Sequence, residues 1–132
     1  MIKSITTVKA QARQRRRKAI RKRMHGDMNR PRLVVFRSLK HIYAQIVDDD
    51  QGRILVSMST RAKDYQPPAA PEKKKKKAPS RRVSESFQVG LMLGEKAKAA
   101  GIETVCFDRA GYKFHGRVKA LAEGTRKAGL SF

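Results

Sequence analysis

Three short runs of β-branched and aromatic residues follow one another in the first half of the chain. They are RLVVFRS (32–38), HIYAQIVD (41–48) and RILVSMS (53–59). Such residues favour strands, and the short polar connections between the runs favour hairpins. The second connection, DDDQG, ends in Gly52 and is typical of a tight turn. We therefore predict an antiparallel meander of three strands.

Alternation within these runs gives the predicted meander one apolar face. Successive side chains of a strand point to opposite faces, so one face collects the apolar positions of the second and third runs. These positions are Ile42, Ala44, Ile46, Ile54, Val56 and Met58. The opposite face carries His41, Tyr43 and Gln45 from the second run. The first run does not alternate cleanly, so its pattern does not say which of its faces is buried.

The segment SESFQVGLMLGEKAKAAG (84–101) has the residue spacing of a helix. Either Ser84 or Ser86 can cap its start, and Gly101 can end it. Gly90 and Gly94 lie four residues apart, and therefore on one side of this helix. We expect them to let the helix approach the sheet closely.

A fourth strand and a last helix complete the pattern. IETVCFD (102–108) is nearly all apolar, as is typical of a strand buried on both faces. The last helix, about residues 116–128, has a buried face formed by Val118, Leu121, Ala122 and Thr125. The element order implies a right-handed crossover that adds a fourth, parallel strand to the meander. We predict an α/β fold: a ribonuclease-H-like mixed sheet with two packed helices.

The charge lies mostly outside this predicted core. The 132 residues include 32 Lys and Arg but only 11 Asp and Glu, a net charge of +21. Residues 1–32 and 61–82 together hold +18 of it. Self-repulsion on this scale in a small chain indicates a polyanionic partner. We predict a basic arm over 1–30 and a single domain over 31–132, with a Pro/Lys-rich loop at 64–82.

The two basic segments differ in character. VKAQARQRRRKAIRKRMHG (8–26) contains good helix formers, but its cations fall on all sides of a helix, which leaves nothing to pack on in water. We predict a nucleic-acid-binding arm that is helical against phosphates, rather than a solvated tail or a targeting sequence. DYQPPAAPEKKKKKAPSRR (64–82) predicts an extended, mobile loop that attracts phosphates without specificity, rather than a nuclear-import signal.

Several classes of protein are disfavoured by the sequence. It has no apolar run long enough to span a membrane and no signal-peptide core, so we expect a soluble cytoplasmic protein. Cys106 is the single cysteine and is expected to be buried without a disulfide. A nuclease of this fold needs several converging carboxylates, but Asp108 stands alone and the first strand offers Arg37 and Ser38. We predict no enzymatic activity, no metal site and no cofactor.

Two long stretches resemble a known family. RPRLVVFRSLKHIYAQIVDD (30–49) and FDRAGYKFHGRVKALAEGTRKAGLSF (107–132) are similar to the bacterial L18 family of large-ribosomal-subunit proteins, which bind 5S ribosomal RNA. The match spans roughly 1–60 and 84–132, whereas the Pro/Lys-rich loop departs from the compact helical connection of that family. The resemblance implies a structural protein that attaches 5S RNA to the large-subunit RNA in the central protuberance, beside neighbouring ribosomal proteins.

Two other binding functions remain open at this stage. A DNA-compacting protein would need an apolar dimer interface, and a membrane-surface binder would need an amphipathic arm. Neither feature is visible in the sequence.

The candidate RNA-binding residues form three groups. Cations of the arm and of the start of the domain form the first: Arg13, Arg15, Arg16, Arg17, Lys18, Arg21, Lys22, Arg23, Arg30 and Arg32. The resemblance implies that a sheet edge faces RNA through the second: Arg37, Ser38, Lys40, His41, Tyr43 and Gln45. The third lies in the loop before the last helix: Arg109, Tyr112, Lys113, His115 and Arg117.

The loop of the third group follows a strand end and precedes a helix N-terminus, where N–H groups and cations attract phosphate. Tyr112 and Phe114 offer flat faces for unstacked bases, and we expect Phe114 to be the buried ring of the two. We expect Asp108 to accept a backbone N–H of the turn that follows, or to position an arginine.

Overall fold

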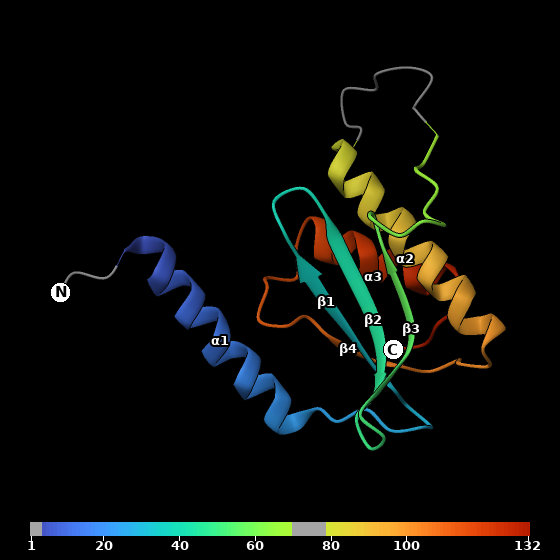
Figure 1. Ribbon diagram of the computed structural model, residues 1–132, viewed down its shortest axis with the longest axis horizontal. Helices are drawn as coiled ribbons and strands as arrows, with labels where there is room; N and C mark the ends of the chain where they lie inside the picture. The colour runs from blue at the N-terminus through green and yellow to red at the C-terminus, as the bar shows by residue number, and fades with distance from the viewer. Residues whose placement is uncertain (1–3, 70–78) are drawn as a thin grey trace.

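The computed structural model describes residues 4–69 and 79–132, and within them a four-stranded sheet has helices on one side and a separate helix beside it (Figure 1). The elements are α1 (Ile5–Arg23), β1 (Arg32–Arg37), β2 (Ile42–Asp48), β3 (Arg53–Ser59), α2 (Arg81–Ala99), β4 (Cys106–Asp108) and α3 (Arg117–Lys127). In Figure 1, α2 and α3 lie behind the sheet and α1 stands apart from them. The predicted α/β fold is confirmed.

The sheet has the predicted mixed topology. Its strand order is β3-β2-β1-β4, with antiparallel pairing among the first three strands and parallel pairing between β1 and β4. Leu33 and Val35 of β1 are buried on the side of α2 and α3, together with the alternating apolar residues of β2. This settles the orientation of the first strand. Val34 and Phe36 therefore lie on the opposite, outer face of the sheet.

The pairing of β3 breaks the predicted alternation. Ile46 pairs with Val56, but the next residue, Val47, pairs with Ile54, so Leu55 is an extra residue in β3. Such a bulge moves every residue beyond it to the other face. The prediction that Ile54 shares a face with Val56 and Met58 is wrong, and Ile54 is 51% exposed.

Helix α2 begins earlier than its apolar pattern predicts. The hydroxyl of Ser80 caps it by accepting the N–H of Val83 at 3.4 Å, so neither Ser84 nor Ser86 is the cap. Ser86 is buried and donates instead to the carbonyl oxygen of Arg82 at 2.8 Å. Residues 81–82 consequently belong to the helix and not to the Pro/Lys-rich loop. The lysine run 73–77 lies outside the described residues.

Glycines allow α2 and α3 to touch along their backbones. A Cβ atom added at Gly90 would lie 2.1 Å from the carbonyl oxygen of Leu121, and one at Gly124 would lie 2.2 Å from that of Phe87. At Gly94 it would lie 2.4 Å from the Cβ of Ala128. The predicted close approach therefore occurs, but it joins the two helices rather than a helix and the sheet.

The last strand is shorter than predicted, and the last helix matches its pattern. β4 occupies an edge of the sheet, which leaves Cys106 and Phe107 half-buried, so the prediction of a strand buried on both faces is wrong. Burial raises the pKa of the Cys106 thiol. Helix α3 buries the four predicted residues, Val118, Leu121, Ala122 and Thr125.

Candidate nucleic-acid interface

Helix α1 carries most of the candidate cations. It has 19 residues, no acidic residue in its first turn and no buried side chain, and the hydroxyl of Ser4 caps it by accepting the N–H of Thr7 at 3.2 Å. The structure contains the predicted helix of the arm. Its sequence predicts nothing for this helix to pack on, but two sets of contacts hold it to the domain.

The first set joins the middle of α1 to the loop after β4. The Nε of Arg16 donates to the carbonyl oxygen of Gly111 at 2.9 Å, and the guanidinium of Arg13 lies over the ring of Tyr112 at 4.7 Å. A Cβ atom at Gly111 would lie 2.6 Å from the carbonyl oxygen of Arg13. Only glycine therefore permits α1 to lie this close to the loop.

The second set centres on Asp49, in the turn between β2 and β3. Its carboxylate accepts the N–H of Gly26 at 2.8 Å, Nη1 of Arg21 at 3.0 Å and Nε of Arg32 at 2.9 Å. The bond from Arg32 is the main reason that the pKa of Asp49 lies well below its usual range, and the bonds from Gly26 and Arg21 lower this pKa further. The end of α1 is thereby tied to β1.

Arg32 was predicted to contact RNA, but two carboxylates hold it inside the protein. Its Nη1 also donates to Asp108 at 2.9 Å, and its side chain is only 11% exposed. A guanidinium with both sides engaged in this way is not available to a phosphate. Sequence reasoning missed this role because the partners lie 17 and 76 residues away.

Other cations of α1 point to solvent. In the part of the chain that the structure describes, six exposed cationic side chains of α1 form neither an ion pair with an acidic residue nor a hydrogen bond to the domain: Lys9, Arg15, Arg17, Lys18, Lys22 and Arg23. The last turn is entirely basic, with Arg21, Lys22 and Arg23. These groups can meet phosphates without breaking a bond in the protein.

Hydrogen bonds of its own residues hold the loop after β4 in place. Asp108 accepts the N–H of Ala110 at 2.8 Å and also holds Arg32, so both roles expected for it are confirmed. Arg109 is itself bonded, because its Nη1 donates to the carbonyl oxygen of Tyr112 at 2.6 Å. Ala110 has a φ of +53°, a strained value for a residue with a side chain.

The prediction for the two rings of this loop is wrong. Tyr112 is 5% exposed, whereas Phe114 is 43% exposed. The Tyr112 ring lies between two guanidinium groups, Arg13 at 4.7 Å and Arg37 at 5.0 Å, and its hydroxyl contacts the backbone of Arg37. Tyr112 therefore has a structural role in this loop. Lys113 and His115 remain exposed.

A second cationic group surrounds the turn between β1 and β2. Ser38 and His41 bond to each other across this turn, and His41 also contacts Thr60 at 2.8 Å. The carbonyl oxygen of Ser38 accepts Nη2 of Arg117 at 2.9 Å, and that of Leu39 accepts Nη1 of Arg82 at 2.7 Å. Both guanidinium groups are thus fixed at one end of the sheet.

These arginines lie close enough to repel one another. Burial lowers the pKa of Arg117, and the positive charges of Arg37 and Arg82 lower it further. Within residues 4–69 and 79–132, none of the three forms an ion pair with an acidic side chain. Unbalanced charge of this kind favours an anion. Sequence reasoning missed Arg82 because it was assigned to the mobile loop, although Ser80 is a helix cap that could have placed it.

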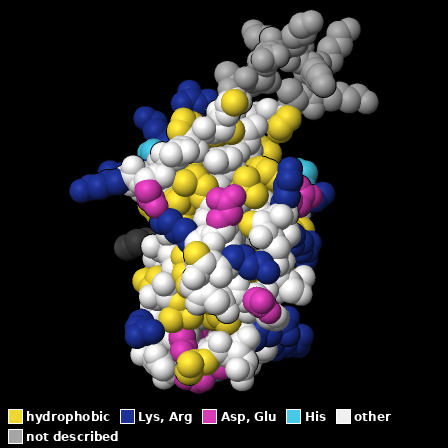
Figure 2. Space-filling view, turned by 90° about the vertical axis from the view of Figure 1, so that its right-hand side faces the viewer, with side chains coloured by type: hydrophobic (Ala, Val, Ile, Leu, Met, Phe, Trp, Pro, Cys, Tyr) yellow, Lys and Arg dark blue, Asp and Glu magenta, His cyan; other side chains and the backbone are white. Residues whose placement is uncertain are grey.

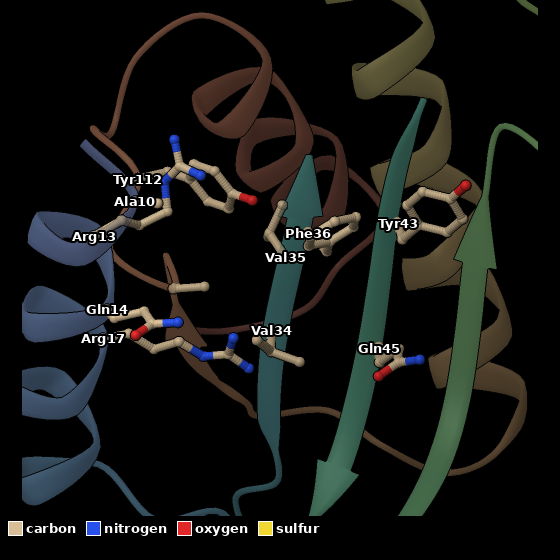
Figure 3. A pocket seen from close by; sticks show the side chains of 11 residues that line it. Ala10, Arg13, Gln14, Arg17, Val34, Val35, Phe36, Tyr43, Gln45 and Tyr112 are labelled. Atoms are coloured by element: carbon tan, nitrogen blue, oxygen red, sulfur yellow. The ribbon is translucent and has the colours of Figure 1, made fainter. Parts of the chain in front are cut away.

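A groove of about 490 Å³ lies between α1 and the outer face of the sheet (Figure 3). One side is formed by residues of α1, and the other by residues of β1, of β2 and of the loop after β4. Its lining is Ala10, Arg13, Gln14, Arg17, Val34, Val35, Phe36, Tyr43, Gln45, Ala110 and Tyr112. Sequence reasoning missed Gln14, Val34 and Phe36, because only the structure places them opposite one another.

The face turned away from α1 differs in character. Figure 2 shows basic, acidic and apolar side chains interspersed there, without one continuous basic area. Of the other candidates, Lys40 is exposed near the β1–β2 turn, and Arg30 donates to the carbonyl oxygen of Val105 at 3.4 Å. The concentration of cations on α1 therefore makes its side of the molecule the candidate interface.

Comparison with known proteins identifies the family of the chain. A family model described as ribosomal L18 of archaea, bacteria, mitochondria and chloroplasts matches residues 7–132. The chain belongs to the ribosomal L18 family. It is 50% identical over 124 residues to the large ribosomal subunit protein uL18 of Thermotoga petrophila, covering 94% of this chain and 95% of that one.

Two further relatives of the same description support the L18 assignment. The uL18 protein of Pelotomaculum thermopropionicum is 52% identical over 120 residues, 91% of this chain and 92% of that one. That of Desulfotalea psychrophila is 48% identical over 127 residues, 96% and 98% of the two chains. Members of the L18 family are structural ribosomal proteins, and this chain is accordingly not an enzyme.

Among residues 4–69 and 79–132, no helix has the length and apolar character needed to cross a bilayer. The same residues contain no group of three or more His, Cys, Asp or Glu side chains arranged to hold a metal ion.

Arg117→Ala is expected to weaken binding of ribosomal RNA about ten- to hundredfold, the range for loss of one charge-assisted hydrogen bond. Filter binding measures the affinity, and thermal melting measures the stability that the bond to Ser38 contributes. Arg126→Ala is the matched control, since Arg126 lies at the other end of α3 and donates to the carbonyl oxygen of Phe132. Parent-like binding combined with a lower melting temperature would make Arg117 a purely structural residue.

Proposed function

We propose that the protein binds 5S ribosomal RNA and helps attach it to the large-subunit RNA in the central protuberance, beside neighbouring proteins of the large subunit. Its relatives are described as large ribosomal subunit proteins, and the chain is a ribosomal protein of the bacterial cytoplasm. The observation that carries the proposal is the solvent-facing charge of α1, a helix that the domain holds in place without using six of its cations.

The chemistry of the interface suits folded RNA with unpaired nucleotides. Cations on α1 can follow a phosphate backbone, which supplies most of the affinity of a nucleic-acid-binding protein. An exposed ring on the adjoining sheet face, Phe36, offers a stacking surface, and proteins recognise RNA sequence mainly through unstacked bases. A purely electrostatic DNA-compacting surface would not need such a ring.

Attachment of one RNA to another requires two cationic surfaces on the protein. The cations of α1 form the first. Arg37, Arg82 and Arg117 form the second, at the end of the sheet where β1 passes to β2. This division supports a bridging role in addition to simple RNA binding.

The proposal is tested by filter binding with three nucleic acids: 5S ribosomal RNA, a transfer RNA as a folded control, and duplex DNA. If about six phosphates are neutralised, the affinity for 5S RNA should fall about a thousandfold between 50 and 200 mM salt. At 150 mM salt, 5S RNA should bind at least about a thousandfold more tightly than either control, the lower end of the range for a specific complex. A flat salt response, or equal affinity for all three, would refute the proposal.

A further inference from the structure

The groove between α1 and the sheet contains an exposed aromatic platform. Phe36 is the last residue but one of β1, lies on the outer face and is 58% exposed. Tyr43, its partner on β2, places its ring 5.8 Å away at an interplanar angle of 47°. A large ring exposed on a strand in this way adds little buried surface to the core. It does present one flat apolar face to the groove.

Side chains that can form hydrogen bonds or carry positive charge surround the platform of Phe36 and Tyr43. Gln14 on α1 and Gln45 on β2 bring amides from opposite sides, and Arg13 and Arg17 line the helical side (Figure 3). Amides donate and accept hydrogen bonds, as the edges of nucleobases do. None of the eleven lining residues is acidic, so the charge of the groove is complementary to an anionic backbone.

We propose that this groove receives one unstacked base of the bound RNA. The base stacks on Phe36 beside Tyr43, Gln14 and Gln45 contact its edge, and its phosphate lies toward Arg17. The volume of about 490 Å³ falls in the usual range, roughly 300–1,000 Å³, of sites that enclose small ligands. The proposal rests on RNA binding as the proposed function and adds the kind of nucleotide that the site takes.

Gly111 sets the position of one wall of the groove. Helix α1 forms that wall, and it reaches the domain through the contact between Arg13 and Gly111, where a Cβ atom would lie 2.6 Å from a carbonyl oxygen. The contact at Gly111 thus fixes the distance of α1 from the sheet. A site whose walls are held in place by the protein loses less entropy on binding.

Phe36→Leu tests the stacking contact. It keeps an apolar side chain but removes the ring, so 5S RNA should bind about five- to hundredfold more weakly, the range for loss of one stacked base. The slope of log affinity against log salt should stay unchanged, because the ring neutralises no phosphate. Phe132→Leu is the control, since that ring packs on Phe107 at 5.4 Å, outside the groove. Equal affinities for both variants would overturn the proposal.

Gly111→Ala tests whether the position of α1, which forms one wall of the groove, matters for binding. Gly101→Ala is a closely matched control. The two glycines have nearly the same φ, +80° and +82°, so alanine is strained equally at both. At Gly101, however, no atom lies within 4 Å of an added Cβ. Gly111→Ala should therefore reduce the affinity for 5S RNA about tenfold more than Gly101→Ala does, through loss of a wall held in place. Equal binding by the two variants would contradict a fixed groove.

Ultraviolet cross-linking of the wild-type protein, followed by mass spectrometry, locates the base directly. The probes are 5S ribosomal RNA and a single-stranded oligoadenylate. A nucleotide adduct on Phe36 or Tyr43 is expected with 5S RNA. An adduct only at other residues would refute the proposal that the groove receives a base. If 5S RNA fails to bind but oligoadenylate forms an adduct at Phe36, the result supports the base-binding groove and refutes 5S RNA binding as the function.

Discussion

Replacement of Arg15, Lys18, Lys22 and Arg23 by glutamine is expected to weaken binding of 5S ribosomal RNA about 4,000-fold at 100 mM salt. Each phosphate contact releases nearly one counterion, which corresponds to just under a factor of ten in affinity at this salt concentration. The slope of log affinity against log salt should fall by about three to four. Filter binding across a salt series measures both quantities.

The fold should survive these four substitutions. None of the four side chains is buried, and the residues that hold α1, namely Arg13, Arg16 and Arg21, are left in place. Glutamine is also a good helix former.

The control is a variant with the same loss of charge elsewhere on the molecule. It replaces the exposed residues Arg53, Arg61, Lys63 and Lys98 by glutamine. If this control loses as much affinity as the α1 variant, net charge rather than a located interface governs binding.

Asp49→Asn is expected to lower the free energy of unfolding by about 3 kcal/mol, because it leaves the buried guanidinium of Arg32 with one carboxylate in place of two. Arg21 and the N–H of Gly26 lose their charged acceptor as well. Thermal melting should show a decrease of about 10 °C for a chain of this size. Asp50→Asn, one residue further along the same turn, is the control, because the Asp50 side chain is 58% exposed.

The pH dependence of the free energy of unfolding also distinguishes Asp49→Asn from Asp50→Asn. The pKa of Asp49 is lower in the folded protein than in the unfolded chain, so its stabilising contribution is complete above about pH 4 and is lost only as pH falls further. The deficit of Asp49→Asn should therefore be constant from pH 5 to pH 8. A deficit that disappeared within this interval would contradict the assigned ion pairs.

The contribution of His25 to stability depends on pH in the opposite direction to that of Asp49. Its hydrogen bond with Asp50 raises the pKa of the imidazole, so this interaction stabilises the fold at low pH and is lost as pH rises through the folded value. The small effect of Asp50→Asn should accordingly be largest at pH 5 and should decrease as the pH rises.

The parts of the fold that follow local patterns were predictable from the sequence. Alternation in β2 identified Ile42, Ala44 and Ile46 as core, and helical spacing identified the buried face of α3. Ile54 was misplaced because a bulge inserts one residue into β3 without any sign in the pattern of apolar residues. Gly90 was correctly linked to close packing, but its partner, Leu121, could be identified only from the tertiary structure.

The candidate site was predictable in composition but not in the role of each residue. The exposed cations of α1 could be recognised from sequence, because density of charge is a local property. Tyr112 was expected to be exposed, yet Arg13 and Arg37 cover it from elements far away in the chain. Arg32 differs from its neighbours only through Asp49 and Asp108, which the fold brings beside it. Contacts between residues that lie far apart in the sequence cannot be inferred from the spacing of residue types along the chain.

The attachment of α1 also has a consequence for the order of events during synthesis. A ribosome makes the chain from its N-terminus, so α1 emerges first. Its attachments, however, are Asp49 and the loop that ends at Tyr112, which emerge much later. For most of the time that the chain is being translated, its most cationic segment therefore has no fixed position. The nascent protein acquires its ordered RNA-binding surface only when translation is almost complete.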